Sequence, residues 1–278
     1  MKRELNQIFK LSARLPGRLL VPILLAAVTC IHLLPNENML AENRVDPVDT
    51  LLVDALKLSN NGNEYQALEL YQQILNREPG HYEALWNASL LLTRLGRQQK
   101  TGDQVLNYYN RARFVADQCL RHHPDKPRCH YTYGLALAGI VDEIPTSAQR
   151  IDYIWKVKEH GEKALESDPD YAPNWHLLGI LHSKLSTLSR AEKLGARVLF
   201  GRLPEGSTAE RAEEYLLKAI ELDPNTILFH LDLAQHYQET GQPQNARPHL
   251  ERALALESSH KFDDLNQEEA RERLKAVQ

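Results

Sequence analysis

The sequence predicts an all-α protein: a superhelical solenoid of about five helical hairpins, with one extra inserted helix and a C-terminal capping helix. Three observations support this prediction. A proline recurs at one place in a repeated pattern, compact side chains recur at fixed distances from it, and apolar residues follow the period of an amphipathic helix. The prolines are Pro79, Pro124, Pro169 and Pro224. Because proline lacks a backbone N–H group, each one is expected to end the second helix of a hairpin.

Compact side chains surround each proline at constant offsets, which lets antiparallel helices approach closely. Twelve positions before the prolines lie Ala67, Ala112, Val157 and Ala212; five positions before lie Ile74, Cys119, Ala164 and Ala219; ten positions after lie Ser89, Gly134, Gly179 and Ala234. These offsets are those of the tetratricopeptide repeat (TPR). The sequence therefore predicts TPR-type hairpins, stacked into a scaffold that binds a partner.

The first two hairpins follow the repeat most simply. We expect the first hairpin over about 48–81, with a turn at Gly62, and this stretch has the 34-residue period of the repeat. The second begins at Tyr82, and Gly96 is expected to close its first helix. The interval between its two flanking prolines is 45 residues, so 11 residues are inserted, and we place them around 97–105.

The third and fourth hairpins are longer. The third is expected to have its connection at 141–149. The fourth opens at Trp175, and 55 residues separate its flanking prolines, an excess of 21 over the repeat. Residues 188–200 have a helical period of their own and predict an extra helix, followed by a loop at 201–206 and a second hairpin helix at 209–222.

The fifth hairpin turns at Gly241 and has Ser258 where the earlier ones have proline. Residues 261–278 are expected to form a charged capping helix, and Asn266–Glu269 has the pattern of a capping box at a helix start. A helix with a polar outer face is what a solenoid needs to close its exposed end. The solenoid itself is expected to occupy residues 42–260.

Residues 1–41 are expected to form a signal peptide or an N-terminal membrane anchor. Five basic residues precede an apolar stretch at 19–34, which is the layout of a secretory signal. The stretch has sixteen residues, whereas a membrane-spanning helix needs about 20. We therefore expect export to the periplasm or cell envelope, or anchoring in the membrane by this segment. The alternative is a disordered tail or buried helix in a cytoplasmic protein.

The charge balance and the motifs exclude several functions. The remaining 237 residues carry 28 basic and 35 acidic side chains, and this argues against nucleic acid, because phosphate binding needs a basic stripe. No Gly-rich phosphate loop, no Gly-x-Ser-x-Gly elbow and no His-Glu-x-x-His motif occurs in the sequence. We therefore predict that the protein is not an enzyme and needs no cofactor.

The binding surface is predicted from the repeat itself. In TPR solenoids the first helix of each hairpin lines the concave face, with its fifth and ninth positions pointing into it. These positions give the predicted binding residues Trp86, Leu90, Tyr131, Leu135, His176 and Ile180. They form an aromatic and aliphatic trough that suits an apolar peptide, a helix or a lipid chain. The alternative is that the extra helix at 188–200 folds back and fills the trough as ordinary core.

Cysteines and histidines cluster around Pro124. Cys119 and Cys129 stand on either side of this turn, a placement compatible with a disulfide in an oxidising compartment or with two buried thiols. His122, His123 and His130 are close in sequence. Zinc needs four converging ligands, but Cys119 occupies a buried helix position and the two adjacent histidines point in different directions. We therefore predict no metal site.

Short motifs follow one another in a fixed order between residues 161 and 253. They are Lys163-Ala164, Asp168-Pro169, Leu177-Leu178-Gly179, Leu188-Ser189, Ala196, Leu199-Phe200-Gly201, Pro204, Ala212, Lys218-Ala219 and Leu222-Asp223-Pro224. In these motifs, and in its long fourth hairpin, the chain resembles the regulator of microtubule dynamics protein family. It departs from the family at Arg190, where Trp is usual, and at Pro204, where a Pro-Pro pair is common. The resemblance implies the family's repeat fold, while microtubule binding is suggested by the family's name alone.

These observations together predict a non-enzymatic scaffold or adaptor. We expect it to bind a protein or peptide segment, whose identity the sequence does not give, in its concave face. The alternative function is that of a carrier, which would hold a lipid or another apolar ligand in the same trough.

Overall fold

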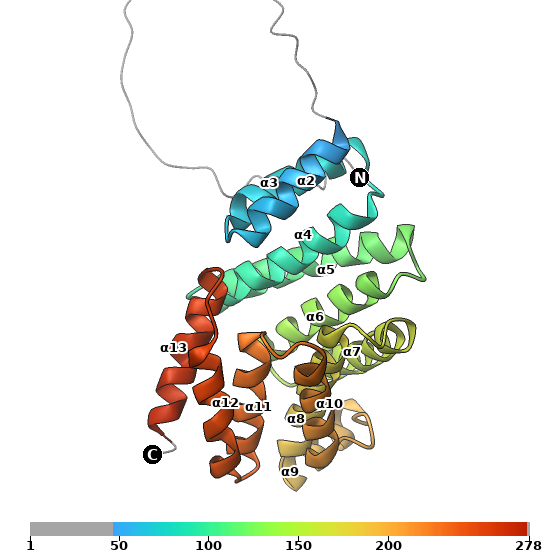
Figure 1. Cartoon of the computed structure of the whole chain (residues 1–278). Coiled ribbons are helices and arrows are strands. Elements are labelled where there is room, and N and C mark those ends of the chain that lie inside the picture. Colours follow the sequence, from blue (N-terminus) through green and yellow to red (C-terminus); the bar gives the residue numbers. More distant parts are fainter. Residues whose placement is uncertain (1–46, 277–278) are drawn as a thin grey trace, which may run out of the picture. The chain divides into compact units, whose positions relative to one another are not determined.

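The structure is a computed structural model that describes residues 47–276. This part of the chain consists of helices joined by turns and loops, without a strand (Figure 1). The helices are α2 (Val48–Asn60), α3 (Glu64–Arg77), α4 (Tyr82–Arg97), α5 (Gly102–His122), α6 (Pro127–Glu143), α7 (Ala148–Ser167), α8 (Ala172–Thr187), α9 (Arg190–Phe200), α10 (Ala209–Leu222), α11 (Ile227–Glu239), α12 (Pro243–Ala255) and α13 (Lys261–Lys275).

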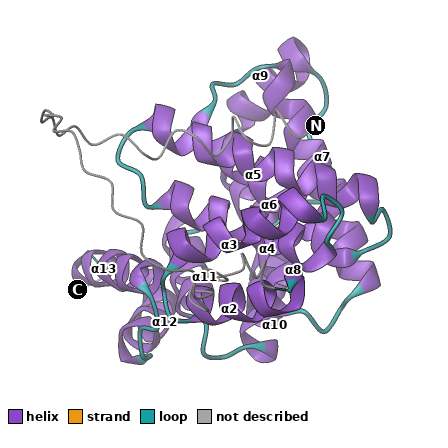
Figure 2. Ribbon diagram, turned by 90° about the horizontal axis from the view of Figure 1, so that it is seen from above, coloured by secondary structure: helices purple, strands orange, loops and turns teal. Residues whose placement is uncertain are grey.

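The helices pack as successive antiparallel hairpins. The pairs are α2 with α3, α4 with α5, α6 with α7, α8 with α10, and α11 with α12. Each hairpin also contacts the next one, through α3 and α4, α5 and α6, α7 and α8, and α10 and α11 (Figures 1 and 2). The predicted all-α superhelical solenoid is confirmed. The inserted helix α9 packs against α7, and α13 packs against α11 and α12.

The predicted N-terminal segment, residues 1–41, lies outside the described residues. Within residues 47–276, no helix combines the length and the apolar character that crossing a membrane requires.

The second hairpin differs from the prediction. Gly96 does not close α4, which continues through it to Arg97, and the inserted residues lengthen α5 to 21 residues. The reason lies in Tyr109, which the longer helix carries. A Cβ atom at Gly96 or at Gly139 would lie 2.8 Å from atoms of the Tyr109 ring. Both glycines therefore make room for this ring between α4 and α6.

The last helix begins where the predicted segment 261–278 does, but not at its expected capping box. The capping box expected at 266–269 is not used, because α13 begins at Lys261 with His260 as its N-cap. The Nδ1 atom of His260 accepts a hydrogen bond of 3.2 Å from the backbone N–H of Asp263. Phe262 and Asn266 are buried. Burial of Phe262 in the first turn explains why the helix begins earlier than its polar motif indicates.

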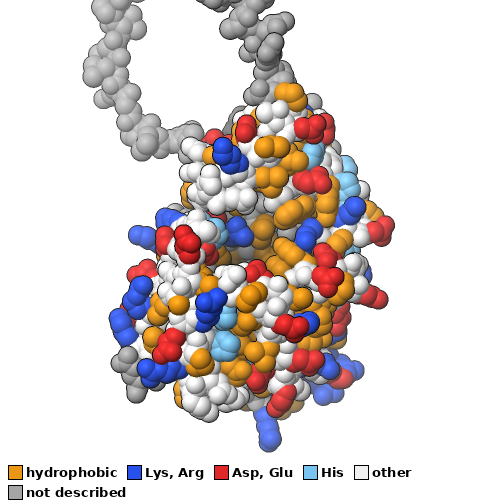
Figure 3. All heavy atoms as spheres, in the orientation of Figure 1, with side chains coloured by type: hydrophobic (Ala, Val, Ile, Leu, Met, Phe, Trp, Pro, Cys, Tyr) orange, Lys and Arg blue, Asp and Glu red, His pale blue; other side chains and the backbone are white. Residues whose placement is uncertain are grey.

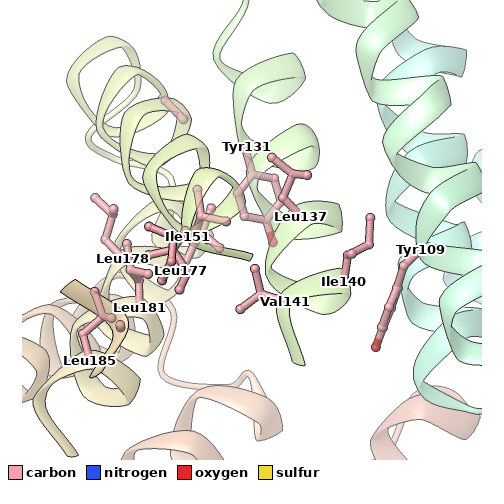
Figure 4. Close-up of a cluster of buried hydrophobic side chains, with 14 residues drawn as sticks. Tyr109, Tyr131, Leu137, Ile140, Val141, Ile151, Leu177, Leu178, Leu181 and Leu185 are labelled. Atoms are coloured by element: carbon pink, nitrogen blue, oxygen red, sulfur yellow. The ribbon is translucent and has the colours of Figure 1, made fainter. Parts of the chain in front are cut away.

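A large buried cluster lies where α5, α6, α7 and α8 meet (Figure 4). Most of its side chains come from both helices of the third hairpin, α6 and α7, and from the first helix of the fourth, α8. Tyr109 comes from α5 of the second hairpin, and Ala196 comes from α9. The residues labelled in Figure 4 are Tyr109, Tyr131, Leu137, Ile140, Val141, Ile151, Leu177, Leu178, Leu181 and Leu185. Such a core stabilises each hairpin only through its neighbours, as is usual for repeat proteins.

Two helical glycines give a matched test of this close packing. At Gly179 in α8, a Cβ atom would lie 2.8 Å from Leu216 Cγ and 3.2 Å from the Leu216 backbone nitrogen, whereas at Gly195 in α9 it would meet nothing within 4 Å. We expect Gly179→Ala to lower the free energy of unfolding by about 1–2 kcal/mol, because the clash exceeds the gain in helix propensity. Gly195→Ala should instead stabilise α9 by about 1 kcal/mol. Urea unfolding of the two variants would check this, and equal effects of one sign would contradict it.

The two ends of the hairpin array touch one another. A Cβ atom at Gly62, in the turn of the first hairpin, would lie 3.1 Å from His260 Cβ at the start of α13. The guanidinium carbon of Arg97, at the end of α4, lies 5.2 Å from the centroid of the Phe262 ring. The capping helix therefore packs on the fifth hairpin and also reaches the first two.

Candidate functional site

A cavity of about 810 Å³ lies between the first helices of four hairpins. These helices are α4, α6, α8 and α11, and the segment that leads into α13 forms another wall. Figure 3 shows this face hollowed at its centre, with hydrophobic side chains inside the hollow. The volume is within the range of small-molecule and cofactor sites, which is about 300–1,000 Å³.

Five of the six predicted binding residues line this cavity. They are Leu90 from α4, Tyr131 and Leu135 from α6, and His176 and Ile180 from α8. Leu90, Leu135 and Ile180 are half-buried, whereas Tyr131 and His176 are buried. The three aliphatic side chains thus come from equivalent places in three consecutive hairpins and form an apolar strip along the cavity.

Trp86, the sixth predicted residue, does not line the cavity. Its ring lies beneath Arg128, whose guanidinium carbon is 5.9 Å from the ring centroid. The same guanidinium carbon lies 3.0 Å from the centroid of the Tyr171 ring. Arg128 Nη2 also forms an ion pair with Asp168 Oδ2 at 3.4 Å. Trp86 is therefore part of a cation–aromatic contact between hairpins.

A buried histidine and a largely buried carboxylate form one wall of the cavity. His176 Nε2 donates a hydrogen bond of 2.8 Å to Asp232 Oδ2 on α11. Burial acts to raise the pKa of the Asp232 carboxyl, but the hydrogen bond from His176 and the nearby cations Arg97 and Lys184 outweigh it, so the pKa is lowered overall. Asp232 is therefore an anion at neutral pH, fixed in position by His176.

Sequence reasoning missed a further row of lining residues, one helical turn beyond the ninth positions. Four residues from four hairpins lie there: Arg94, Gly139, Lys184 and Glu239. Their signal was the i+4 spacing from Leu90, Leu135 and Ile180, and from Gln235, the ninth position of the fifth hairpin, since residues four apart share a helix face. Three of the four are charged, so the apolar strip has a charged border. Lys184 on α8 also forms an ion pair with Asp142 on α6, another residue that lines the cavity.

The extra helix does not fill the trough. None of the residues that line the cavity comes from α9, which packs against α7 instead. Ala196 on its inner face belongs to the buried cluster of Figure 4, and Phe200 packs against this cluster. The alternative that residues 188–200 fold back into the trough is therefore wrong.

The cysteines and histidines near Pro124 have separate partners. Cys119 in α5 and Cys129 in α6 form a disulfide with 5.3 Å between their Cα atoms, and both are buried. His123 Nε2 donates to the carbonyl of Gly80 at 2.6 Å. His130 pairs with His160 on α7. No group of three or more His, Cys, Asp or Glu side chains suited to a metal ion occurs among residues 47–276.

Relatives of known name match most of the chain. It is 28% identical to regulator of microtubule dynamics protein 2 of Homo sapiens over 225 residues, which are 80% of this chain and 54% of that protein. It is 30% identical to regulator of microtubule dynamics protein 1 of Mus musculus over 181 residues, which are 64% of this chain and 57% of that protein. The chain thus spans a little over half the length of these relatives.

Among solved structures, a thermophilic TPR protein of Thermus thermophilus superposes with a TM-score of 0.60 at 19% identity, covering 83% of this chain and 98% of that one. This likeness supports the TPR fold. The family described as "Regulator of microtubule dynamics protein 1-3" matches residues 51–278. The chain therefore belongs to the regulator of microtubule dynamics protein family.

Proposed function

We propose that the protein is a non-enzymatic scaffold that binds a segment of a partner protein in the cavity between α4, α6, α8 and α11. The observation that carries this proposal is the strip Leu90, Leu135 and Ile180, repeated in register along three hairpins and half-exposed in a cavity of about 810 Å³. A strip with helical repeat spacing fits a helix or an extended segment that presents apolar side chains at regular intervals.

The charged border indicates what else the partner segment carries. Both signs of charge occur in this border: Arg94, Arg97 and Lys184 are basic, whereas Asp142, Asp232 and Glu239 are acidic. We therefore expect an amphipathic segment that carries charged side chains beside its apolar ones. Such grooves typically bind with a Kd in the micromolar range, which corresponds to a binding free energy of about −8 kcal/mol.

A lipid or another apolar ligand is the alternative occupant. The same aliphatic strip would hold an acyl chain, and the cations at its border would hold a phosphate or carboxylate. Native mass spectrometry of the purified full chain separates the two occupants. A co-purifying lipid that disappears in the variant Leu90→Gln/Ile180→Gln would favour the carrier.

The scaffold proposal is tested by photo-crosslinking from the cavity. We expect a photoreactive side chain at Leu90 to crosslink one defined protein, and the same side chain at Leu217, an exposed leucine on α10 outside the cavity, to miss it. A purified segment of that protein should then bind about tenfold more weakly to Leu90→Gln/Ile180→Gln, because two apolar contacts are lost. The control Leu217→Gln should bind as the wild type does. Equal crosslinking from both positions, or unchanged affinity, would refute the proposal.

For the N-terminal segment we retain export or membrane anchoring as the proposal, with a cytoplasmic protein as the alternative. The disulfide between Cys119 and Cys129 supports an oxidising compartment, since such bonds are rare where thiols are kept reduced. Sequencing the N-terminus of the cellular protein tests this. A chain that begins at Met1 in the soluble cytosolic fraction would contradict both export and anchoring.

A further inference from the structure

The inserted helix α9 has two apolar faces, and only one of them is covered. The inner face packs on the core through Ala196 and Phe200. The outer face carries Leu194, Val198 and Leu199, which are 62%, 72% and 70% exposed. Large apolar side chains are rarely this exposed as neighbours on one helix, and a contiguous apolar patch marks an interaction site.

Basic side chains gather beside this outer face. Lys193, Arg197 and Arg202 share one small cavity of about 270 Å³ with the loop that follows α9. Lys193 Nζ donates to the carbonyl of Ser186 at 3.2 Å, and Arg202 forms an ion pair with Glu205. Arg197 is exposed.

The charge of this region is opposite to that of the chain around it. Residues 190–206 contain four basic and two acidic side chains, whereas residues 42–278 as a whole contain 28 basic and 35 acidic ones. One of the two local acids, Glu192, accepts a hydrogen bond from the backbone N–H of Ser189 in the capping box of α9. The other, Glu205, pairs with Arg202. The basic excess is thus concentrated beside the exposed apolar face.

We propose that α9 and the loop at 201–207 form a docking surface for the anionic phospholipid surface of a membrane. Apolar residues on one side and lysine or arginine beside them are the features of helices that lie in the plane of the membrane interface. An eleven-residue helix is about 16 Å long, too short to span a bilayer but sufficient to lie in its interface. In this arrangement Leu194, Val198 and Leu199 enter the acyl boundary, and Lys193, Arg197 and Arg202 contact lipid phosphates.

This docking surface is separate from the proposed partner site. No residue of α9 lines the large cavity, so a failure of either proposal leaves the other standing. A second copy of the chain is a poorer occupant, since it would bring two basic surfaces together.

The test uses the full chain with one fluorescent probe in α9. Val198→Cys in a Cys30→Ser background leaves a single free thiol while Cys119 and Cys129 are bridged. With an environment-sensitive dye at this position, we expect a blue shift of emission on vesicles that contain phosphatidylserine. Quenching by brominated acyl chains should accompany it. A dye at Val53, also well exposed but on α2, serves as the control and should not be quenched. This local readout separates α9 from any binding by the N-terminal segment.

A charge variant tests the role of the cations. Each lysine or arginine near an anionic surface contributes about fivefold to binding, so Lys193→Gln/Arg197→Gln should raise the lipid concentration that half-saturates the Val198 probe by at least about tenfold. The control Lys57→Gln/Lys261→Gln removes the same charge from exposed positions elsewhere. It should change the half-saturating lipid concentration little. The proposal is overturned if the Val198 probe stays unquenched on bound protein, or if both double variants weaken the response equally. It is also overturned if an acidic polypeptide shifts the probe and vesicles do not.

Discussion

Lowering the pH from 7 to about 4 is expected to destabilise the protein by about 2–4 kcal/mol through two histidine pairs that join hairpin helices. In the first pair, His130 Nδ1 and His160 Nδ1 are 2.8 Å apart. In the second, His230 Nδ1 and His249 Nδ1 are 3.2 Å apart. Each distance requires one nitrogen to donate and the other to accept, so one of the two facing nitrogens in each pair must be unprotonated.

The neighbouring hydrogen bonds define which nitrogen carries the proton. His130 Nε2 donates to the carbonyl of Pro124 at 2.8 Å, and His230 Nε2 donates to the carbonyl of Pro224 at 3.0 Å. The neutral forms of both rings therefore accept at Nδ1, and His160 and His249 donate to them. A second proton on His130 or His230 would set two N–H groups against each other.

The pKa values follow from this geometry. Burial, reinforced by the partner histidine, lowers the pKa of His160 and of His249 to about 4, and burial also lowers the pKa of His130 and His230. Glu159 opposes the shift at His160, whereas Lys163 adds to it. Because an unfolded histidine titrates near pH 6.5, the unfolded state takes up protons first as the pH falls. The stabilisation is complete above about pH 6.5 and is lost as the pH falls toward about 4.

The variant His160→Gln/His249→Gln isolates this effect from other acid-sensitive groups. A glutamine amide still offers a donor to His130 and His230 but does not titrate. Urea unfolding at several pH values between 7 and 4 should show a steep decrease in the free energy of unfolding for the wild type and a shallower decrease for the variant. Parallel decreases would show that the pairs do not cause the acid sensitivity.

Removal of the disulfide in Cys119→Ala/Cys129→Ala is expected to lower the free energy of unfolding by about 2–3 kcal/mol. The bond closes a short loop around the turn between α5 and α6, with a sequence separation of 10 residues, and a loop of this size restricts the unfolded chain by about that amount. It also joins the second and third hairpins, whose contact the rest of the array depends on. Urea unfolding without reductant, for the wild type and the variant, would measure the difference.

Two controls accompany the disulfide experiment. The wild type in reductant should match the double variant, and Cys30→Ser, which leaves both bridged cysteines in place, should unfold as the wild type does. Intact-mass measurement after alkylation without reductant gives an independent answer. Alkylation of both Cys119 and Cys129 in the folded protein would contradict the bond.

The hairpins were predictable because their signals are local. A proline, a compact residue and an apolar stripe all act within one helix or between two adjacent helices, so the second helix of the fourth hairpin was expected at 209–222, where α10 is found. The inserted helix was also predicted, since residues 188–200 have a helical period of their own, and in the structure Ser189 and Glu192 form its capping box. The longer α5 was not, because its extra turns are held by Tyr109 packing on two glycines of other helices.

The candidate site was predictable only in part for the same reason. Fifth and ninth positions follow from the repeat, and five of the six predicted residues line the cavity. Trp86 does not, because Arg128 from the next hairpin covers it. Asp232 and Phe262 come from the fifth hairpin and the capping helix, and they reach the cavity only because the array curves back on itself. Nothing in the sequence of one repeat encodes that curvature.

The contact between the first and last parts of the array has a kinetic consequence. His260 and Phe262 meet Gly62 and Arg97, and three of these residues, Arg97, His260 and Phe262, also line the cavity. Separation of the two ends would therefore widen the cavity at this border and ease the release of a guest. Substitutions at this junction should shorten the residence time of a guest more than they weaken the equilibrium affinity.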